Sequence, residues 1–454
     1  MKRREFLRNG VAASTALAAD RFIRPLHAAP KNDQITLKCV STWGSASEFD
    51  RKLAAEFMEA NPNIRIEFAA LGKHYDRQKV EAQQAGDPFD LWITGSFYSM
   101  WATQMGYTID PEPLYRRDFG PDYKSLFFDE FVRWQGKMVG VLTSRSARVF
   151  YYNKDIIEAA GLSLPHEDWT WDDFFRIATG TLERDAQGDI VQWGCTVYET
   201  DLFRFYISLE GQSMFSADYR QATIDTPVGH DAASAIHDLA FKHRAMGERA
   251  HWRVTEDVAT SWNHGAFNAG KVALLLADDG RIKPAHERAD AAGFRLGVAP
   301  LPRRKRNVAG FENMVYQIWK SPDPARTEAA WKFAKSYLTR ENQVRTMIEE
   351  GFPPVRRDAY DDPAAVKFQQ QWPDVQVAHN AYEHGRFDAR IAAYPTMALE
   401  YVGVRPHIYQ MMMQKLTPED AVKQMQTKCQ QILDKFWAKA DQGTYELFPE
   451  ELHK

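Results

Sequence analysis

Cysteine is scarce in this sequence and long apolar runs are missing, and both facts exclude classes of protein. The three cysteines are Cys39, Cys195 and Cys429, and their spacing fits neither a zinc motif nor a redox motif. Cys39 lies inside an apolar stretch, so we expect it to be a small buried hydrophobic residue. No run of about 18 or more apolar residues occurs, so the sequence predicts no membrane-spanning helix.

Motifs that would carry catalysis or hold a cofactor are also missing. Residues 265–272 nearly match a phosphate-binding loop, but Val272 replaces the Ser or Thr that holds magnesium, and a β-rich run follows. The segment around Ser213 lacks the last glycine of a nucleophile elbow. His379 and His384 have no carboxylate between them at metal-ligand spacing. The sequence therefore predicts no cofactor, no metal site and no catalytic residue.

The chain begins with a basic segment that resembles a twin-arginine export signal. Arg3 and Arg4 precede Phe6 and Leu7, and the mildly apolar run at 11–19 is too short to span a membrane. We expect cleavage after Ala28, with Ala18 as the other candidate, and a disordered basic tail is the alternative reading. No cysteine follows at a lipid-attachment position, so a soluble periplasmic protein is expected rather than a lipoprotein.

The net charge of the exported chain argues against some classes of partner. Removing residues 1–28 takes away six basic and two acidic residues and leaves a net charge of −8. This balance argues against nucleic acid or an anionic membrane surface as a partner. The chain also has 13 tryptophans, which suits a protein that needs flat binding surfaces.

Strand and helix signals alternate along the chain. Strands are expected at 35–41, 64–68, 90–93, 272–277 and 314–318, with helices at 49–60, 97–105 and 327–338. This alternation predicts mostly parallel α/β sheets, in which ligands bind at the carboxyl ends of the strands. Residues 42–47, 71–75 and 94–97 are therefore candidate ligand loops. Residues 153–294 are expected to form a second α/β lobe, with a return crossing at 296–299.

The most informative stretch is 136–174. Two β-rich runs, 138–142 and 147–152, precede a helix capped by Asn153 and a second helix capped by Thr170. The stretch contains no nucleophile–base pair and no metal cluster. A crossing followed by two helices favours a binding scaffold.

Several segments together resemble the extracellular solute-binding proteins, the sugar-binding family that feeds ABC importers. They are, in family order, PFDLWITGSFYSMWATQMGYTIDP, VFYYNKDIIEAAGL with WTWDDF, AFNAGKVALLL, AAWKFAKSYLTRENQVRTMIEEGFPPVR and LTPEDAVKQMQTKCQQIL. The resemblance runs from about Ile35 to the C-terminus. One departure is Leu142-Thr143, where the family usually has a proline at the crossing.

The resemblance implies a two-lobed, maltose-binding-protein-like α/β fold with hinge-linked lobes and a ligand cleft between them. The expected parts are a signal at 1–28, a first lobe at 29–143 plus 298–342, and a second lobe at 144–297 plus 343–454. The implied function is a monomeric periplasmic receptor that binds a carbohydrate and delivers it to the permease of an ABC importer.

A sugar needs an aromatic platform and hydrogen-bond partners for its hydroxyls, and the strand-end loops supply both. Trp43 and Arg145 each have an alternative reading, as a core tryptophan and as an interlobe salt bridge. The ligand-binding candidates are Trp43, Ser45, Tyr75, Gly95, Ser96, Arg145, Ser146, Arg148, Tyr198, Asp278, Asp279, Glu312, Asn313 and Tyr401.

Three rival readings stay open at this point. An exported carbohydrate-active enzyme could use Asp278 and Asp279 as acid and base. A polyamine site would use the same acids with Glu312, and a phosphorylated solute would need Arg145 and Arg148.

Overall fold

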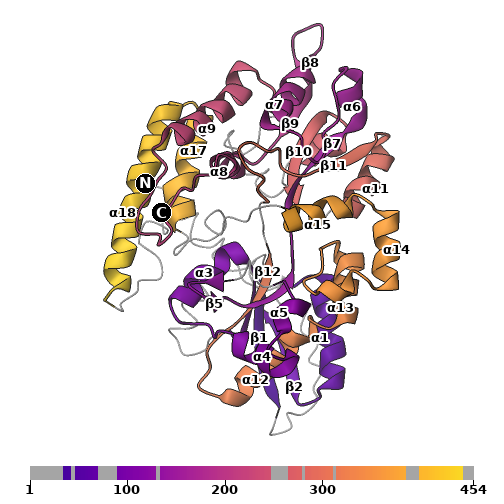
Figure 1. The fold of residues 1–454 in the computed structure, drawn as a ribbon, viewed down its shortest axis with the longest axis vertical. Helices are drawn as coiled ribbons and strands as arrows, with labels where there is room; N and C mark the ends of the chain where they lie inside the picture. Colours follow the sequence, from indigo (N-terminus) through magenta and orange to yellow (C-terminus); the bar gives the residue numbers. More distant parts are fainter. Residues whose placement is uncertain are drawn as a thin grey trace, which may run out of the picture.

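The computed structural model describes residues 34–41, 46–69, 89–128, 133–246, 264–278, 282–309, 313–384 and 398–442. Within these ranges the chain forms two five-stranded sheets with helices packed around them, arranged as two lobes (Figure 1). The expected signal and five of the candidate residues lie outside the described residues: Trp43, Ser45, Tyr75, Asp279 and Glu312.

The first sheet has the strand order β2-β1-β3-β12-β6. Its strands are β1 (Ile35–Ser41), β2 (Ile64–Ala69), β3 (Leu91–Gly95), β6 (Val141–Ser144) and β12 (Met314–Ile318). β1 runs parallel to β2 and β3, and only β12 is antiparallel to its neighbours. The prediction of a mostly parallel sheet is therefore confirmed for this lobe.

Helices cover both faces of the first sheet. α1 (Glu48–Ala60) and α12 (Pro324–Ser336) pack on one face, and α3 (Ser96–Gln104) lies on the other, where Val40 and Trp92 meet Trp101. α1 begins at Ser47, whose hydroxyl accepts from the Asp50 amide at 3.0 Å while the Asp50 carboxylate accepts from the Ser47 amide at 2.9 Å. This reciprocal cap satisfies two backbone donors that have no partner within the helix.

The second sheet has the order β11-β7-β10-β9-β8. Its strands are β7 (Arg148–Asn153), β8 (Glu183–Arg184), β9 (Ile190–Thr196), β10 (Val272–Asp278) and β11 (Leu296–Ala299). β7 is antiparallel to both β10 and β11, so this sheet is mixed rather than parallel. All of β11 pairs with β7, so the chain returns to the first sheet only after Ala299.

The remaining elements cover the sheets or connect the lobes. They are α4 (Glu112–Phe119), α5 (Tyr123–Leu126), β4 (Arg133–Trp134), β5 (Lys137–Met138), α6 (Lys154–Ala159), α7 (Trp171–Gly180), α8 (Glu199–Leu209), α9 (Pro227–His237), η1 (Asp238–Lys242), α10 (His264–Asn268), α11 (Ile282–Ala292), α13 (Arg340–Arg345), η4 (Thr346–Glu350), η5 (Arg357–Ala359), α14 (Pro363–Gln371), α15 (Val375–His384), η6 (Leu399–Val404), α17 (Arg405–Met412) and α18 (Pro418–Ala440).

One expected strand is divided in two. The run 138–142 contributes Met138 to a hairpin with β4 and Val141–Leu142 to β6, with Val139 and Gly140 between them. A Cβ at Gly140 would lie 2.8 Å from the carbonyl oxygen of Tyr316, so β12 passes too close for any side chain there. The glycine thus marks the point where the chain leaves the hairpin and joins the first sheet.

The three cysteines are free and buried. Burial raises the pKa of each thiol, so none is poised to ionise. The prediction that Cys39 is a small buried hydrophobic residue is confirmed. Among the described residues, no helix is both long and apolar enough to cross a membrane.

Candidate functional site

The pairing registers show which sheet edges face the space between the lobes. In the first sheet Gly95 pairs with Met314, and Met314 pairs with Ser144, so these three residues share one edge. In the second sheet Arg148 pairs with Asp278 at the end of β10. The short segment from Ser144 to Arg148 joins the two edges directly. Residues at these edges therefore border the interlobe space.

Seven of the described candidates come together at these two edges. Gly95 and Ser96 start α3, Tyr198 precedes α8, and the remaining members sit on strand ends or the crossing: Ser146, Arg148, Asp278 and Asn313. Their meeting at one place is what the strand-end rule for α/β sheets predicts. Their contact with a ligand stays a prediction.

The crossing is fixed by hydrogen bonds to the returning strand. The Ser146 amide donates to Asn313 Oδ1 at 3.3 Å, and Thr143 Oγ1 donates to the Met314 carbonyl at 3.2 Å. Gln343 Nε2 adds a bond to the Thr143 carbonyl at 2.9 Å. The Ser146 hydroxyl is buried and has no hydrogen-bond partner in the described part of the chain, which makes it a donor suited to a ligand hydroxyl.

Arg145 is engaged within the protein. Its side chain is fully buried, its Nε donates to the Pro354 carbonyl at 3.1 Å, and its Nη2 donates to the Tyr360 hydroxyl at 2.5 Å. The guanidinium also stacks 3.7 Å from the ring centroid of Phe128. These contacts join the first crossing to the segment that follows η4. Arg145 thus braces the crossing through a carbonyl, a phenol and an aromatic ring.

A buried ion network forms the second-lobe wall of the site. Asp201 contacts Arg148 at 3.4 Å and Arg204 at 2.5 Å. Glu400 contacts Arg204 at 3.3 Å and Arg405 at 3.0 Å, and its side chain is fully buried. Charges removed from water are tolerated only when they are paired and hydrogen-bonded. The network therefore locks β7, α8, η6 and α17 into one arrangement.

Two tyrosines lie on this network. The Arg405 guanidinium carbon is 4.9 Å from the ring centroid of Tyr401 and 5.8 Å from that of Tyr198. Tyr401 also packs against the apolar cluster around Trp101 and Trp319 in the first lobe. Tyr401 therefore reaches from the C-terminal helices across to the first lobe.

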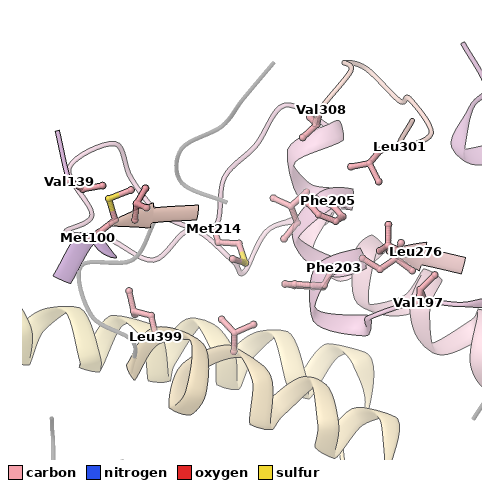
Figure 2. Packing of buried hydrophobic residues seen from close by; sticks show 14 of the residues in the cluster. Met100, Val139, Val197, Phe203, Phe205, Met214, Leu276, Leu301, Val308 and Leu399 are labelled. Carbon is pink, nitrogen blue, oxygen red and sulfur yellow. The ribbon is translucent and has the colours of Figure 1, made fainter. Parts of the chain in front are cut away.

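Apolar contacts also pass between the lobes at this level. Figure 2 shows Met100 and Val139 of the first lobe, Phe203 and Phe205 of α8, and Met214 between these groups; all belong to one buried cluster. The lobes thus share a continuous core beside the polar site, and this core limits how α3 and α8 move relative to each other.

A second set of polar groups marks the start of α1 in the first lobe. Asp50 Oδ1 accepts from the hydroxyls of Tyr337 at 2.7 Å and Tyr316 at 3.1 Å. Burial raises the pKa of the nearby Glu350 carboxyl, and the Asp50 charge raises it further. These groups therefore surround the first turn of α1.

Sequence reasoning missed Glu400, Arg405 and Trp101. Glu400 and Arg405 are five residues apart in a largely apolar segment, so a buried ion pair could have been suspected there. No neighbouring residue indicated that Trp101 lies at the site, because it does so through the packing of the distant Tyr401 against its cluster. Among the described residues, no group of histidines, cysteines and acids is placed to hold a metal ion.

Comparison with known proteins identifies the family. Residues 52–376 match the family described as bacterial extracellular solute-binding protein, which is more than half of the chain. The chain belongs to this family. Its family and fold are those of binding proteins rather than enzymes.

Solved structures of ABC sugar-binding proteins share the fold. An ABC substrate-binding protein of Listeria monocytogenes in complex with cycloalternan has a TM-score of 0.74 and 18% identity, over 88% of this chain and all of the other. Maltose-bound MalE3 of T. maritima has a TM-score of 0.69 and 21% identity with the same coverage. The predicted maltose-binding-protein-like fold is confirmed.

One curated relative is named after the sugar that it binds. The arabinooligosaccharide-binding protein of Halalkalibacterium halodurans is 26% identical over 238 residues, which is half of each chain. The family therefore places this protein among the bacterial extracellular solute-binding proteins, and one of its relatives is named as a sugar-binding protein.

We expect Glu400→Gln to lower the free energy of unfolding by roughly 3 kcal/mol, because it leaves the buried Arg204 and the half-buried Arg405 without their shared carboxylate. Glu419→Gln is the matched control, since its exposed pair with Lys423 is worth at most about 0.5 kcal/mol. Urea unfolding followed by circular dichroism measures both. Equal effects of the two substitutions would contradict a stabilising role for the network.

The raised pKa of Glu350 predicts a pH dependence of stability. A carboxyl whose folded pKa is raised contributes stability that is complete below its ordinary value of 4.5 and is lost as pH rises through the folded value. We therefore expect Glu350→Gln to gain stability relative to the wild type as pH rises from 4 to 7. Urea titrations across this range test it, with Glu349→Gln, an exposed neighbour paired to Arg345, as the control. A constant difference between Glu350→Gln and wild type would contradict the prediction.

Proposed function

We propose that the protein is the periplasmic receptor of an ABC importer and binds a neutral carbohydrate between its lobes. The observation that supports this proposal is a pair of half-buried tyrosines, Tyr198 and Tyr401. Arg405 lies over both rings at the sheet edge that faces the other lobe. Aromatic faces match the C–H face of a sugar ring, and charged partners bind its hydroxyls.

The charge of the described wall favours an uncharged ligand. In the ion network, the guanidiniums of Arg148, Arg204 and Arg405 contact the carboxylates of Asp201 and Glu400, and the buried Glu199 adds a third acid at the start of α8. A polyamine would require surplus acid and a phosphorylated solute would require surplus base. A wall whose charges are balanced can form hydrogen bonds with hydroxyl groups and does not require a charged ligand.

The residues divide into direct and supporting roles. Tyr198 and Tyr401 form the aromatic platform, while the buried hydroxyls of Ser146 and Thr200, for which the described residues offer no hydrogen-bond partner, bind ligand hydroxyls. Glu400 and the arginines hold the tyrosines in place. We keep the remaining predicted candidates as ligand contacts, apart from Arg145, which we assign to the crossing: Trp43, Ser45, Tyr75, Gly95, Ser96, Arg148, Asp278, Asp279, Glu312 and Asn313.

Binding is expected to close the two lobes about the crossing, and the closed form is the one that the permease recognises. We propose that the first lobe comprises 29–143 and 300–342 and the second 144–299 and 343–454. This moves the expected boundary between 297 and 298 by two residues, because all of β11 pairs with β7. Export with cleavage after Ala28 and a monomeric state belong to the same proposal.

The first test is a titration of tryptophan fluorescence in the exported form with neutral sugars, sugar acids, polyamines and glycerol phosphates. We expect one class of neutral sugar to give a saturable, micromolar response that does not decay on incubation. A response that fades as product accumulates would favour an exported enzyme. Saturation only by a charged class would overturn the neutral-ligand proposal.

The aromatic platform has its own test. We expect Tyr198→Ala and Tyr401→Ala each to weaken the binding of the identified sugar about tenfold or more, because a ring contact and its buried area are lost. Phe175→Ala, which removes a partly buried ring from α7 beside His243, is the control and should bind normally. Isothermal titration measures the affinities. Wild-type affinity in both tyrosine variants would remove them from the site.

A further inference from the structure

A cavity of about 150 Å³ lies beside the segments that connect the lobes, apart from the candidate sugar site. One wall comes from β11 and the return crossing, through Val298, Leu301 and Val308. The other wall comes from α15, through Val377 and Ala381. None of these residues belongs to the tyrosine platform or to the ion network. We refer to this space as the hinge cavity.

The lining indicates the kind of molecule that fits. Leu301 and Val308 are buried and lie close together beside α8, next to Phe205 (Figure 2). The amides of Asn307 and Asn380 also line the space, as do Pro300 and the exposed polar residues His166 and Glu167. An apolar cavity of similar size is known to hold benzene. Apolar walls with amides nearby suit a ring-sized neutral molecule that carries one hydroxyl group.

The position of α15 connects this cavity to lobe movement. Asn380 and Ala381 face the return crossing, while His379, in the same turn, lies with Nδ1 3.4 Å from Arg145 Nη2 in the first crossing. α15 therefore contacts both segments that must bend when the lobes close. A molecule wedged between α15 and the return crossing interacts differently with the open and closed forms, and this difference is what couples two sites.

We propose that the hinge cavity is a second ligand site, that it takes a small neutral molecule with an apolar ring and a hydroxyl group, and that its occupancy shifts the equilibrium of lobe closure. The binding part stands independently of the sugar-receptor function. The coupling part rests on that proposed function.

The binding part is tested with phenol as the probe, followed by ligand-observed NMR. For a ligand of this size we expect saturable binding with a Kd on the order of 1 mM. Ala381→Phe fills the cavity from a partly exposed helix position. We expect it to weaken the binding of phenol about tenfold or more. Ala364→Phe, the same change at an exposed site on the adjacent α14, is the matched control and should bind like the wild type.

Val377→Phe fills the same space from a second position, so binding can still be tested if one of the two variants does not fold. Circular dichroism shows which variants are folded. Binding without saturation in the wild type, or wild-type binding in a folded filling variant, would overturn the second site. These outcomes do not depend on any sugar.

The coupling part is tested by titrating the sugar found by fluorescence with and without saturating phenol. We expect its Kd to change by about threefold, and the change to vanish in Ala381→Phe. An unchanged Kd with phenol bound would overturn the coupling and leave the second site in place. If no sugar binds but phenol does, the receptor proposal fails and the hinge cavity stands.

Discussion

The second-lobe side of the cleft depends on one buried carboxylate. Glu400 is fully excluded from water and pairs with Arg204 on α8 and Arg405 on α17. Both guanidiniums pair with Glu400, and Arg204 has a second carboxylate partner in Asp201, so the buried charges compensate one another. Arg405 then lies over the two tyrosine rings, so their positions follow from this pairing. In the proposed binding role, a rigid platform would lose little entropy when a ligand binds, so the network would serve binding as well as folding.

Elements governed by neighbouring residues were predictable from the sequence. The caps at Ser47, Asn153 and Thr170 act within three residues, and each begins the expected helix. The apolar run of β10 was likewise expected and forms a central strand buried on both sides. Strand-end positions also indicated the correct sheet edges, because parallel strands end together.

Roles fixed by distant residues were not predictable. Arg145 bonds to Pro354 and Tyr360, 209 and 215 positions away, and no local pattern signals such partners. The pair of Arg204 and Glu400 spans 196 positions in the same way. The division of the 138–142 run depends on the approach of Tyr316 to Gly140. In each case the sequence reports the residue type, while the fold decides what that residue contacts.

The contacts around the crossing also restrict where the hinge can bend. Thr143 is bonded to Met314 and Gln343 on the first-lobe side, and Arg148 is paired with Asp201 on the second-lobe side. In this crossing, the backbone between these anchors is 144–147, and within it the Ser146 amide still donates to Asn313 Oδ1. Arg145 lies inside this interval, yet its side chain is held by Pro354 and Tyr360, which belong to neither sheet. In the proposed closure, the segment from Pro354 to α15 would follow Arg145, because the Arg145 side chain is bonded to it.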